Sequence, residues 1–328
     1  MIRSDITTDS RRCSQFKKGV LALKNPALFP WPAGIFAPAS GLSIYDFFVY
    51  WHYQCMSQAT PIGHPSRNAA HRGPVFLPWH RYYLMRFEDY LRQAIGDPTF
   101  RIPYWNFGND GNLPPANQGS ALIWSILSEF LDPVIWPIRL HPHRDGISAM
   151  TVMPAGIALQ RTLGVGSSGL KLPTTAECKD VIAMDGALDL YEKGVAPFFI
   201  PTYDANSFGF RNRLESGQGM ASTSMHNGVH NWIGGDMGTG ASPNDPVFFL
   251  HHANIDRMWH AWRKNTHFSP TCHSTWSRQR CCSIATAIAC LHILMRPWHR
   301  RMCSTLVLDT SMTRWRICIK GRLAKPIE

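Results

Sequence analysis

Two clusters of histidine, each in an apolar and aromatic stretch, contain the residues best suited to chemistry in this sequence. The first cluster holds His52, His71 and His80, and the second holds His226, His230 and the adjacent pair His251 and His252. Neutral imidazole is the commonest metal ligand in proteins, and it suits copper, zinc, iron and nickel. Two sets of three imidazoles would serve two neighbouring ions. The sequence therefore predicts a binuclear metal site, with copper as the preferred metal.

The spacing within the second cluster favours metal binding over hydrolysis. His226 and His230 are four residues apart, so on a helix both project from one face and can bind one ion. Zinc proteases use the same spacing with a glutamate directly after the first histidine, but this chain has Asn227 there. Of the adjacent pair, only one can face the ion directly, because consecutive helical residues point about 100° apart. We expect that residue to be His252 rather than His251.

The first cluster combines a loop with the start of a helix. His71 and His80 bracket Gly73-Pro74 and Pro78, and proline fits the first turn of a helix because its missing N–H would be unpaired there anyway. We expect the other histidines to be ordinary core or surface residues: His64, His141, His143, His260, His267, His273, His292 and His299.

Helices must bring these ligands together. Apolar residues at helical spacing predict helices over Gln15–Lys24, Ile44–Met56, from Pro78 to near Gly96, Met225–Trp232 and Val247–Lys264. The last four would carry the histidines, in the way that bundle proteins build metal sites from inward-facing side chains. The predicted fold class is mainly α, with a central four-helix bundle around a binuclear metal site, long loops and little β structure.

Composition divides the chain into two parts. The 328 residues are 45% hydrophobic and 17% charged, as in globular proteins, yet ten of the 33 basic residues and two of the 22 acidic ones follow position 264. Six of the nine cysteines also lie there. We expect a metal-binding domain over residues 1–264 and an atypical basic, Cys-rich tail over 265–328. The tail is either the product of a shifted reading frame or a genuine extension.

Charge and hydropathy exclude several partners. Residues 1–264 are nearly balanced in charge and contain no motif that reads a nucleic-acid groove, so we expect no nucleic acid. No run of about 18 apolar residues predicts a membrane span. The N-terminus lacks the form of a secretory signal, which leaves a cytoplasmic protein or a secreted one whose leader is missing. No feature indicates an oligomeric state.

The segments around both clusters resemble those of the tyrosinases, the type 3 copper proteins that also include catechol oxidases and molluscan haemocyanins. Residues 43–53 resemble the first ligand helix, and residues 71–88 resemble the remainder of the first copper signature. Residues 225–262 resemble the second signature, including Ser242-Pro243-Asn244-Asp245-Pro246. The similarity runs from about residue 11 to residue 264, and two signatures in the right order make it specific.

The resemblance implies a role for each matching residue. It implies two copper ions, one bound by His52, His71 and His80 and the other by His226, His230 and His252. It also implies that Glu215 holds a water beside the second copper and that Asn227 polarises this water. From the residues alone, Glu215 could instead be an ordinary carboxylate at a helix start or pair with Arg211 or Arg213. Asn227 could cap a helix or bond to the backbone. Asp256 and Asn254 resemble groups that fix ligand orientation, although Asp256 could equally pair with an arginine.

The implied activity is that of an oxidase that converts monophenols and o-diphenols to o-quinones with O2, as in melanin biosynthesis. The implied partners are a phenolic small molecule and O2. The alternatives are a catechol oxidase only, a haemocyanin-like O2 carrier, a tyrosinase-related protein with zinc or no redox activity, and a damaged product that does not fold. Asn106-Phe107 replaces the Asp-Trp of many members and favours the third alternative. The tyrosines typical of the end of the catalytic domain are also missing, so the domain would be incomplete at its C-terminal end.

Overall fold

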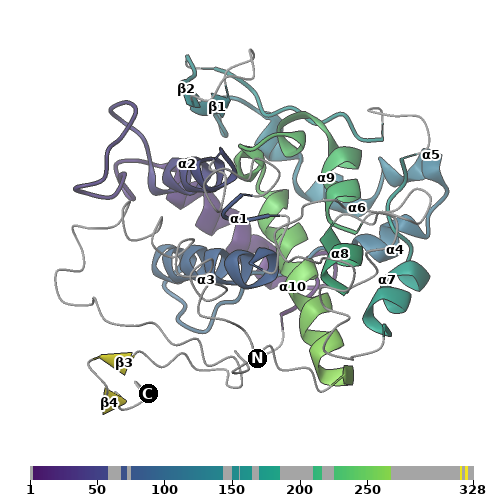
Figure 1. Cartoon of the computed structure of the whole chain (residues 1–328). Helices are drawn as coiled ribbons and strands as arrows, with labels where there is room; N and C mark the ends of the chain where they lie inside the picture. The colour runs from purple at the N-terminus through teal and green to yellow at the C-terminus, as the bar shows by residue number, and fades with distance from the viewer. Residues whose placement is uncertain are drawn as a thin grey trace.

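Four helices from two separate stretches of the chain form the centre of the computed structural model (Figure 1). They are α2 (Ile44–Ser57), α3 (Phe76–Ile95), α9 (Asn227–Ile233) and α10 (Val247–Thr266). The structure describes residues 3–57, 68–71, 75–142, 150–154, 156–164, 170–184, 210–215, 225–266, 318–319 and 322–323. In Figure 1, α10 runs through the middle of the molecule, with α2 and α3 on one side and α9 on the other. The predicted mainly helical fold with a four-helix centre is confirmed.

The first helix, α1 (Ser10–Lys24), covers this centre by packing against α3 and α2. Phe16, Val20 and Leu23 fall at helical spacing on one face of α1, and all three are fully buried. Asp9 caps the helix, because its side chain accepts a hydrogen bond from the N–H of Arg12 at 2.9 Å. The sequence pattern thus predicted this helix and its end correctly, although the helix begins five residues before the predicted start.

A buried network of polar groups holds the start of α2. The Asp46 carboxylate accepts hydrogen bonds from the N–H and the hydroxyl of Ser43, at 2.9 and 2.8 Å. Its other oxygen lies 2.6 Å from the ammonium of Lys24 at the end of α1. Both charged side chains are almost fully buried. This pair therefore fixes α1 against α2, the helix that carries His52.

The remaining helices are short and lie outside the centre. They are α4 (Phe107–Gly111), α5 (Pro115–Gln118), α6 (Leu122–Ile126), η1 (Ser128–Leu131), α7 (Thr175–Ile182), α8 (Phe210–Glu215), η3 (Gly235–Gly238) and η4 (Ser242–Asn244). The turns η3 and η4 lie between α9 and α10. They are short 3₁₀ turns, and they fix the chain between α9 and α10.

Strands are few in the described part of the chain. β1 (Leu140–Pro142) pairs antiparallel with β2 (Met150–Val152), and β3 (Cys318–Ile319) pairs antiparallel with β4 (Arg322–Leu323). Neither pair contributes a histidine to the two clusters. Among the described residues, no helix is long and apolar enough to cross a bilayer.

Some of the predictions concern residues outside the described ranges. Most of the Cys-rich tail predicted over 265–328 is among them. So are several of the histidines that we expected to be ordinary: His64, His143, His267, His273, His292 and His299.

Candidate metal centre

The first histidine cluster forms one compact group. His52 comes from α2, His80 from the second turn of α3, and His71 from the segment before α3. Their ring centroids are 5.5 Å apart for His52 and His71, 4.8 Å for His71 and His80, and 5.9 Å for His52 and His80. One ligand nitrogen from each ring lies within 4.8 Å of the other two. The three predicted ligands are therefore brought together.

Backbone carbonyls orient two of these rings. The Nδ1 of His52 lies 2.8 Å from the carbonyl oxygen of Gly240, and the Nδ1 of His80 lies 2.8 Å from that of Phe76. A carbonyl only accepts, so each Nδ1 carries the proton and each Nε2 keeps its lone pair. Both Nε2 atoms are buried, and neither has a hydrogen-bond partner within the described part of the chain. Two lone pairs thus remain for a Lewis acid.

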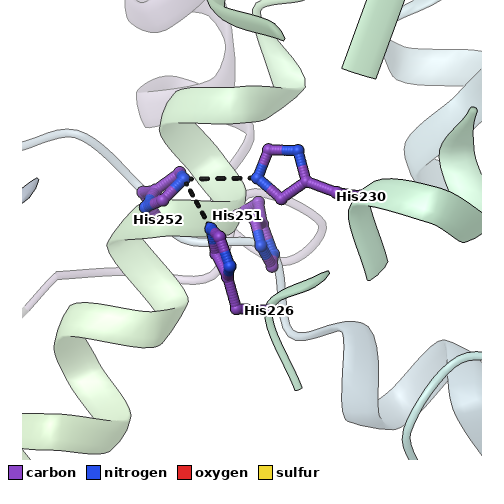
Figure 2. A group of neighbouring side chains, drawn as sticks. All are labelled: His226, His230, His251 and His252. Atoms are coloured by element: carbon purple, nitrogen blue, oxygen red, sulfur yellow. Dashed lines mark hydrogen bonds between the residues drawn. The ribbon is translucent and has the colours of Figure 1, made fainter. Parts of the chain in front are cut away.

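The second cluster is tighter still (Figure 2). The Nε2 of His252 lies 3.3 Å from the Nε2 of His226 and 3.3 Å from that of His230. The Nδ1 of His226 bonds the Oδ1 of Asn227 at 2.7 Å, and the Nδ1 of His230 bonds the carbonyl of Met237 at 2.8 Å. With their protons on Nδ1, both of these rings direct an Nε2 lone pair at His252.

These contacts fit a metal ion better than a hydrogen-bond network. His252 can donate one proton from Nε2 to one of the two facing lone pairs, so the other nitrogen pair would be left as two facing acceptors. Imidazole nitrogens at about 2.0–2.1 Å from one tetrahedral ion lie about 3.4 Å apart. The observed 3.3 Å separations match that spacing. The donor set is all imidazole, which suits copper.

The two groups adjoin each other. The rings of His80 and His252 stack with centroids 4.3 Å apart and planes 7° apart, and the centroids of His71 and His226 are 5.9 Å apart. Rings from the two halves of the chain are therefore in direct contact. Two ions held by these groups would be close neighbours, as the sequence predicted.

Burial keeps the imidazoles neutral. Removal from water lowers the pKa of His52 to about 3, although the Gly240 carbonyl opposes this shift. Burial likewise lowers the pKa of His230 to about 4. For His80 and His252, burial and the neighbouring imidazoles hold the pKa well below its ordinary value. At neutral pH these rings are therefore uncharged and available as ligands.

Aromatic side chains line the space around the ligands. Phe248 contacts the rings of His52 and His252, at centroid distances of 5.0 and 4.2 Å. The ring centroid of Phe76 lies 4.8 Å from that of His80 and 4.7 Å from that of His226, so Phe76 touches both groups. The neighbouring Phe249 instead stacks on aromatic residues of the core. Of this adjacent pair of phenylalanines, Phe248 is therefore the one that faces the ligands.

Glu215 and Asn227 both lie next to the start of α9. Glu215 is buried at the end of α8 and forms an ion pair with Arg211, one turn earlier on that helix. The backbone N–H of His226 donates to the carbonyl of Leu214 at 3.0 Å, which joins the end of α8 to the second group. Asn227 orients the ring of His226, a contact that none of its predicted roles included.

The side chains of Asp256 and Asn254 pair with arginines rather than with the ligand rings. Asp256 forms an ion pair with Arg81 at 2.6 Å, and the Arg81 guanidinium covers the ring of Trp259 at 3.9 Å. The side-chain oxygen of Asn254 accepts from Arg257 at 2.8 Å. The groups that orient the ligands are mainly backbone carbonyls. A sequence pattern gives no signal for these, because every residue has one.

His251 belongs to the second group, although the sequence favoured His252 alone. Its ligand nitrogen lies within 4.8 Å of those of His226, His230 and His252. The ring is fully buried and stands beside Phe107, at a centroid distance of 5.6 Å. The feature of the sequence that pointed to His251 as a member of the group was its position directly before His252.

Comparison of the sequence with known proteins identifies a single family. The chain matches the common central domain of tyrosinase over residues 42–131 and 170–265. It is 34% identical to a tyrosinase of Streptomyces antibioticus over 239 residues, covering 69% of this chain and 75% of that one. It is 33% identical to a tyrosinase of Streptomyces lincolnensis over 272 residues, covering 80% and 85%. A solved polyphenol oxidase of Thermothelomyces thermophila superposes with a TM-score of 0.46 at 18% identity, covering 82% and 72%.

Proposed function

The chain belongs to the tyrosinase family, and from this membership we propose that each of its two histidine groups holds one copper ion. One ion would be bound by His52, His71 and His80, and the other by His226, His230 and His252. The observation that carries the proposal is the set of buried imidazole nitrogens that converge in each group. Copper supplies dioxygen binding and electron transfer from the phenol, by which monophenols and o-diphenols become o-quinones.

The ligand rings contribute fixed orientation and neutrality. The carbonyls of Gly240, Phe76 and Met237 hold the protons of three rings on Nδ1, so that each Nε2 keeps its lone pair for a metal ion. Phe76 and Phe248 exclude water around these nitrogens and offer an apolar wall to an aromatic ring. A phenol is a suitable occupant because it presents one polar atom on an apolar body.

A monophenol needs a local base, and we assign to Glu215 the role of holding it. The hydroxyl of a phenol has an ordinary pKa of about 10, so it must lose its proton to something local at neutral pH. Glu215 is the carboxylate joined to the second group through the Leu214–His226 backbone bond. We propose that Glu215 and Asn227 together hold a water that takes this proton. An o-diphenol, whose oxidation needs no hydroxylation, would depend on this water much less.

The catalytic unit would be residues 1–264, with residues 265–328 as a separate tail. Two observations support this division: α10 ends at Thr266, and the family match ends at residue 265. Limited proteolysis of the copper-loaded chain should release a fragment that ends close to Thr266 and retains both ions. A first cut within α10, or loss of copper from the fragment, would contradict this boundary.

Turnover of two substrates tests the proposed function. Copper-loaded protein should form the o-quinone from both L-tyrosine and L-DOPA and consume O2 in doing so, whereas zinc-loaded protein should do neither. Quinone formation from L-DOPA alone would restrict the protein to diphenol oxidation. Reversible O2 uptake without quinone from either substrate would contradict an oxidase.

A further inference from the structure

One short loop orients a ring in each of the two histidine groups. This loop, residues 234–246, connects α9 to α10 and contains the turns η3 and η4. The carbonyl of Met237 accepts the Nδ1 proton of His230, and the carbonyl of Gly240 accepts that of His52, both at 2.8 Å. The two carbonyls lie close together in the chain, whereas the two rings belong to different groups. The orientation of one ring in each group therefore depends on where this loop lies.

A neighbouring segment, residues 159–164, holds the loop near its start. The carboxylate of Asp236 accepts a hydrogen bond from the N–H of Gln160 at 2.7 Å, and the N–H of Asp236 donates to the carbonyl of Gln160 at 3.0 Å. A Cβ at Gly235 would lie 2.1 Å from that carbonyl oxygen, and the φ of Gly235 is 55°, so this position requires glycine. The backbone of the segment thus lies directly against the loop.

The next residue of the segment, Arg161, holds the loop at its end. Its guanidinium donates two hydrogen bonds to the carboxylate of Asp245, from Nε at 2.6 Å and from Nη2 at 2.8 Å. Both side chains are almost fully buried. Asp245 also accepts from the N–H of Val247 at 3.0 Å, so the ion pair is attached to the first residue of α10 as well.

These two attachments enclose the orienting carbonyls. Gln160 and Arg161 are consecutive, so their bonds to the loop close a ring of chain, with both carbonyls between the two fixed points. Two further bonds reach the loop in η4, where the hydroxyl of Tyr45 and the indole N–H of Trp136 each donate to a backbone carbonyl, at 2.7 and 2.9 Å. Each of these is a single bond between neutral groups. The two-point, charge-assisted pair is therefore the stronger anchor at this end of the loop.

We infer that Arg161 is a positioning residue for both histidine groups, because its pair with Asp245 fixes the loop 234–246. Through the two carbonyls of this loop, Arg161 keeps His52 and His230 in the orientation and the tautomer that leave the lone pair on Nε2. The consequence for metal binding rests on the proposed function, whereas the consequence for the rings does not. Arg161 would thus act on both ions at once, unlike Asn227, which orients only His226.

The tautomers of the rings in the metal-free protein test this inference without any enzyme assay. Arg161→Met has no donor and releases the loop, so nitrogen NMR of the imidazoles should show His52 and His230 as mixtures of both tautomers. His80 is an internal control, because its partner carbonyl belongs to Phe76 of α3, and it should keep its proton on Nδ1. If all three rings stay unchanged, or if all three are disturbed alike, the inference is wrong.

Retention of copper is the second readout. In competition with a chelator, both ions should be lost from Arg161→Met at chelator concentrations lower by about tenfold or more, as expected when an orienting partner is lost. Lys24→Met is the matched control, because it also leaves a buried carboxylate, that of Asp46, without its ion pair, but on a different part of the fold. It should be less resistant to urea and yet retain both ions as the parent chain does. Parental retention in Arg161→Met, loss of only one ion, or equal loss from both variants would overturn the inference.

A double variant keeps the test valid if Arg161→Met does not fold. Arg161→Met/Asp245→Asn removes both buried charges and keeps an oxygen acceptor for the N–H of Val247, so it should fold. It still lacks the two-point pair and should show the same mixed tautomers and the same weaker retention. Parental behaviour of this variant would mean that Arg161 only neutralises a buried charge, which contradicts a positioning role. Arg161→Lys, which keeps the charge but not the fork of donors, should recover only part of the loss.

The two readouts distinguish this inference from the proposed function. If the parent chain binds no copper, but Arg161→Met changes the tautomers of His52 and His230, the proposed function is rejected and the positioning role stands. If the parent chain binds two ions and turns over phenols, but Arg161→Met matches it in tautomers and retention, only the positioning role is rejected.

Discussion

The imidazole rings of His80 and His252 are stacked in parallel, with centroids 4.3 Å apart and planes 7° apart. His80 comes from α3 in the first half of the chain and His252 from α10 in the second, and these two helices pack against each other. The stack therefore joins the two histidine groups into one centre. Each group is oriented by hydrogen bonds of its own, so the close approach of the groups depends on how α3 and α10 pack.

The buried imidazoles should make the metal-free protein sensitive to acid. Their folded-state pKa values lie below the unfolded value of 6.5, at about 3 for His52 and about 4 for His230. Above pH 6.5 both the folded and the unfolded states leave these rings neutral. Below it the unfolded state binds protons first, so the free energy of unfolding falls as the pH falls toward 4, by about 1.4 kcal/mol per pH unit for each such ring.

Urea unfolding of metal-free protein between pH 7.5 and 4.5 measures this effect. A free energy of unfolding that stays constant from pH 6.5 to 5 would show that the rings are protonated equally in both states. Bound metal should shift the loss of stability to lower pH, because protons must then displace the ion as well.

Replacing Glu215 by glutamine should depress monophenol hydroxylation far more than diphenol oxidation. The variant lacks the carboxylate that would hold the proton-accepting water, whereas an o-diphenol needs that water much less. Initial rates with L-tyrosine and L-DOPA give the ratio directly. Equal loss of both rates would reject the role in proton transfer. Glu129→Gln, a carboxylate paired with Lys17 on the outside of the helical centre, should leave the ratio unchanged.

The same substitution has a predicted cost in stability. Glu215 is paired with Arg211, and both side chains are buried. Glutamine would leave the Arg211 charge without this counterion, which typically costs about 3–5 kcal/mol. Chemical denaturation should reveal this loss of stability. The ratio of the two initial rates, measured under conditions well below the unfolding transition, separates the loss of stability from the effect on catalysis.

Replacing Asn227 by alanine should weaken binding of the second copper ion. The amide oxygen of Asn227 accepts the Nδ1 proton of His226 at 2.7 Å and so fixes the ring that presents Nε2. Loss of such an orienting partner typically lowers metal affinity about 10–100-fold. Asn227→Asp retains an oxygen acceptor and should bind copper nearly as well as the parent chain. Chelator competition checks both, and an alanine variant with parental affinity would contradict the assignment.

Removing the Asp46 carboxylate should destabilise the whole helical centre. Asp46→Ala leaves the buried Lys24 ammonium without its partner and removes the hydrogen bonds to Ser43, at a cost of about 3–5 kcal/mol. The double variant Lys24→Met/Asp46→Asn removes both charges and keeps an oxygen acceptor for Ser43. It should therefore recover most of the loss in a denaturation experiment. A double variant as unstable as Asp46→Ala would contradict the role of the ion pair.

Much of the fold could be predicted because its determinants are local. The spacing of Phe16, Val20 and Leu23 gave the buried face of α1, and Gly96 marked the end of α3, where it adopts a left-handed conformation. Thr174 and Glu177, three residues apart, form a capping box at the start of α7. Each of these features depends on residues within a few positions of one another.

The orientation of the ligand rings could not be predicted in the same way. The carbonyl that orients His52 belongs to Gly240, 188 residues away in the chain, and a carbonyl leaves no trace in the sequence. The preference for His252 over His251 depended on the angle between consecutive helical residues. It did not include the position of α9, which places His226 and His230 near both rings. Whether a side chain belongs to a group formed by two helices depends on how those helices pack against each other.

Copper content combined with electron paramagnetic resonance tests the central claim most directly. Two Cu²⁺ ions held this close together by the two groups would couple their unpaired electrons, so the pair would give little resonance signal. The fully oxidised protein should therefore contain two copper ions per chain by mass spectrometry, with a resonance signal that accounts for only a small fraction of them. One ion per chain, or two ions that both give the full signal of isolated Cu²⁺, would contradict a shared binuclear centre.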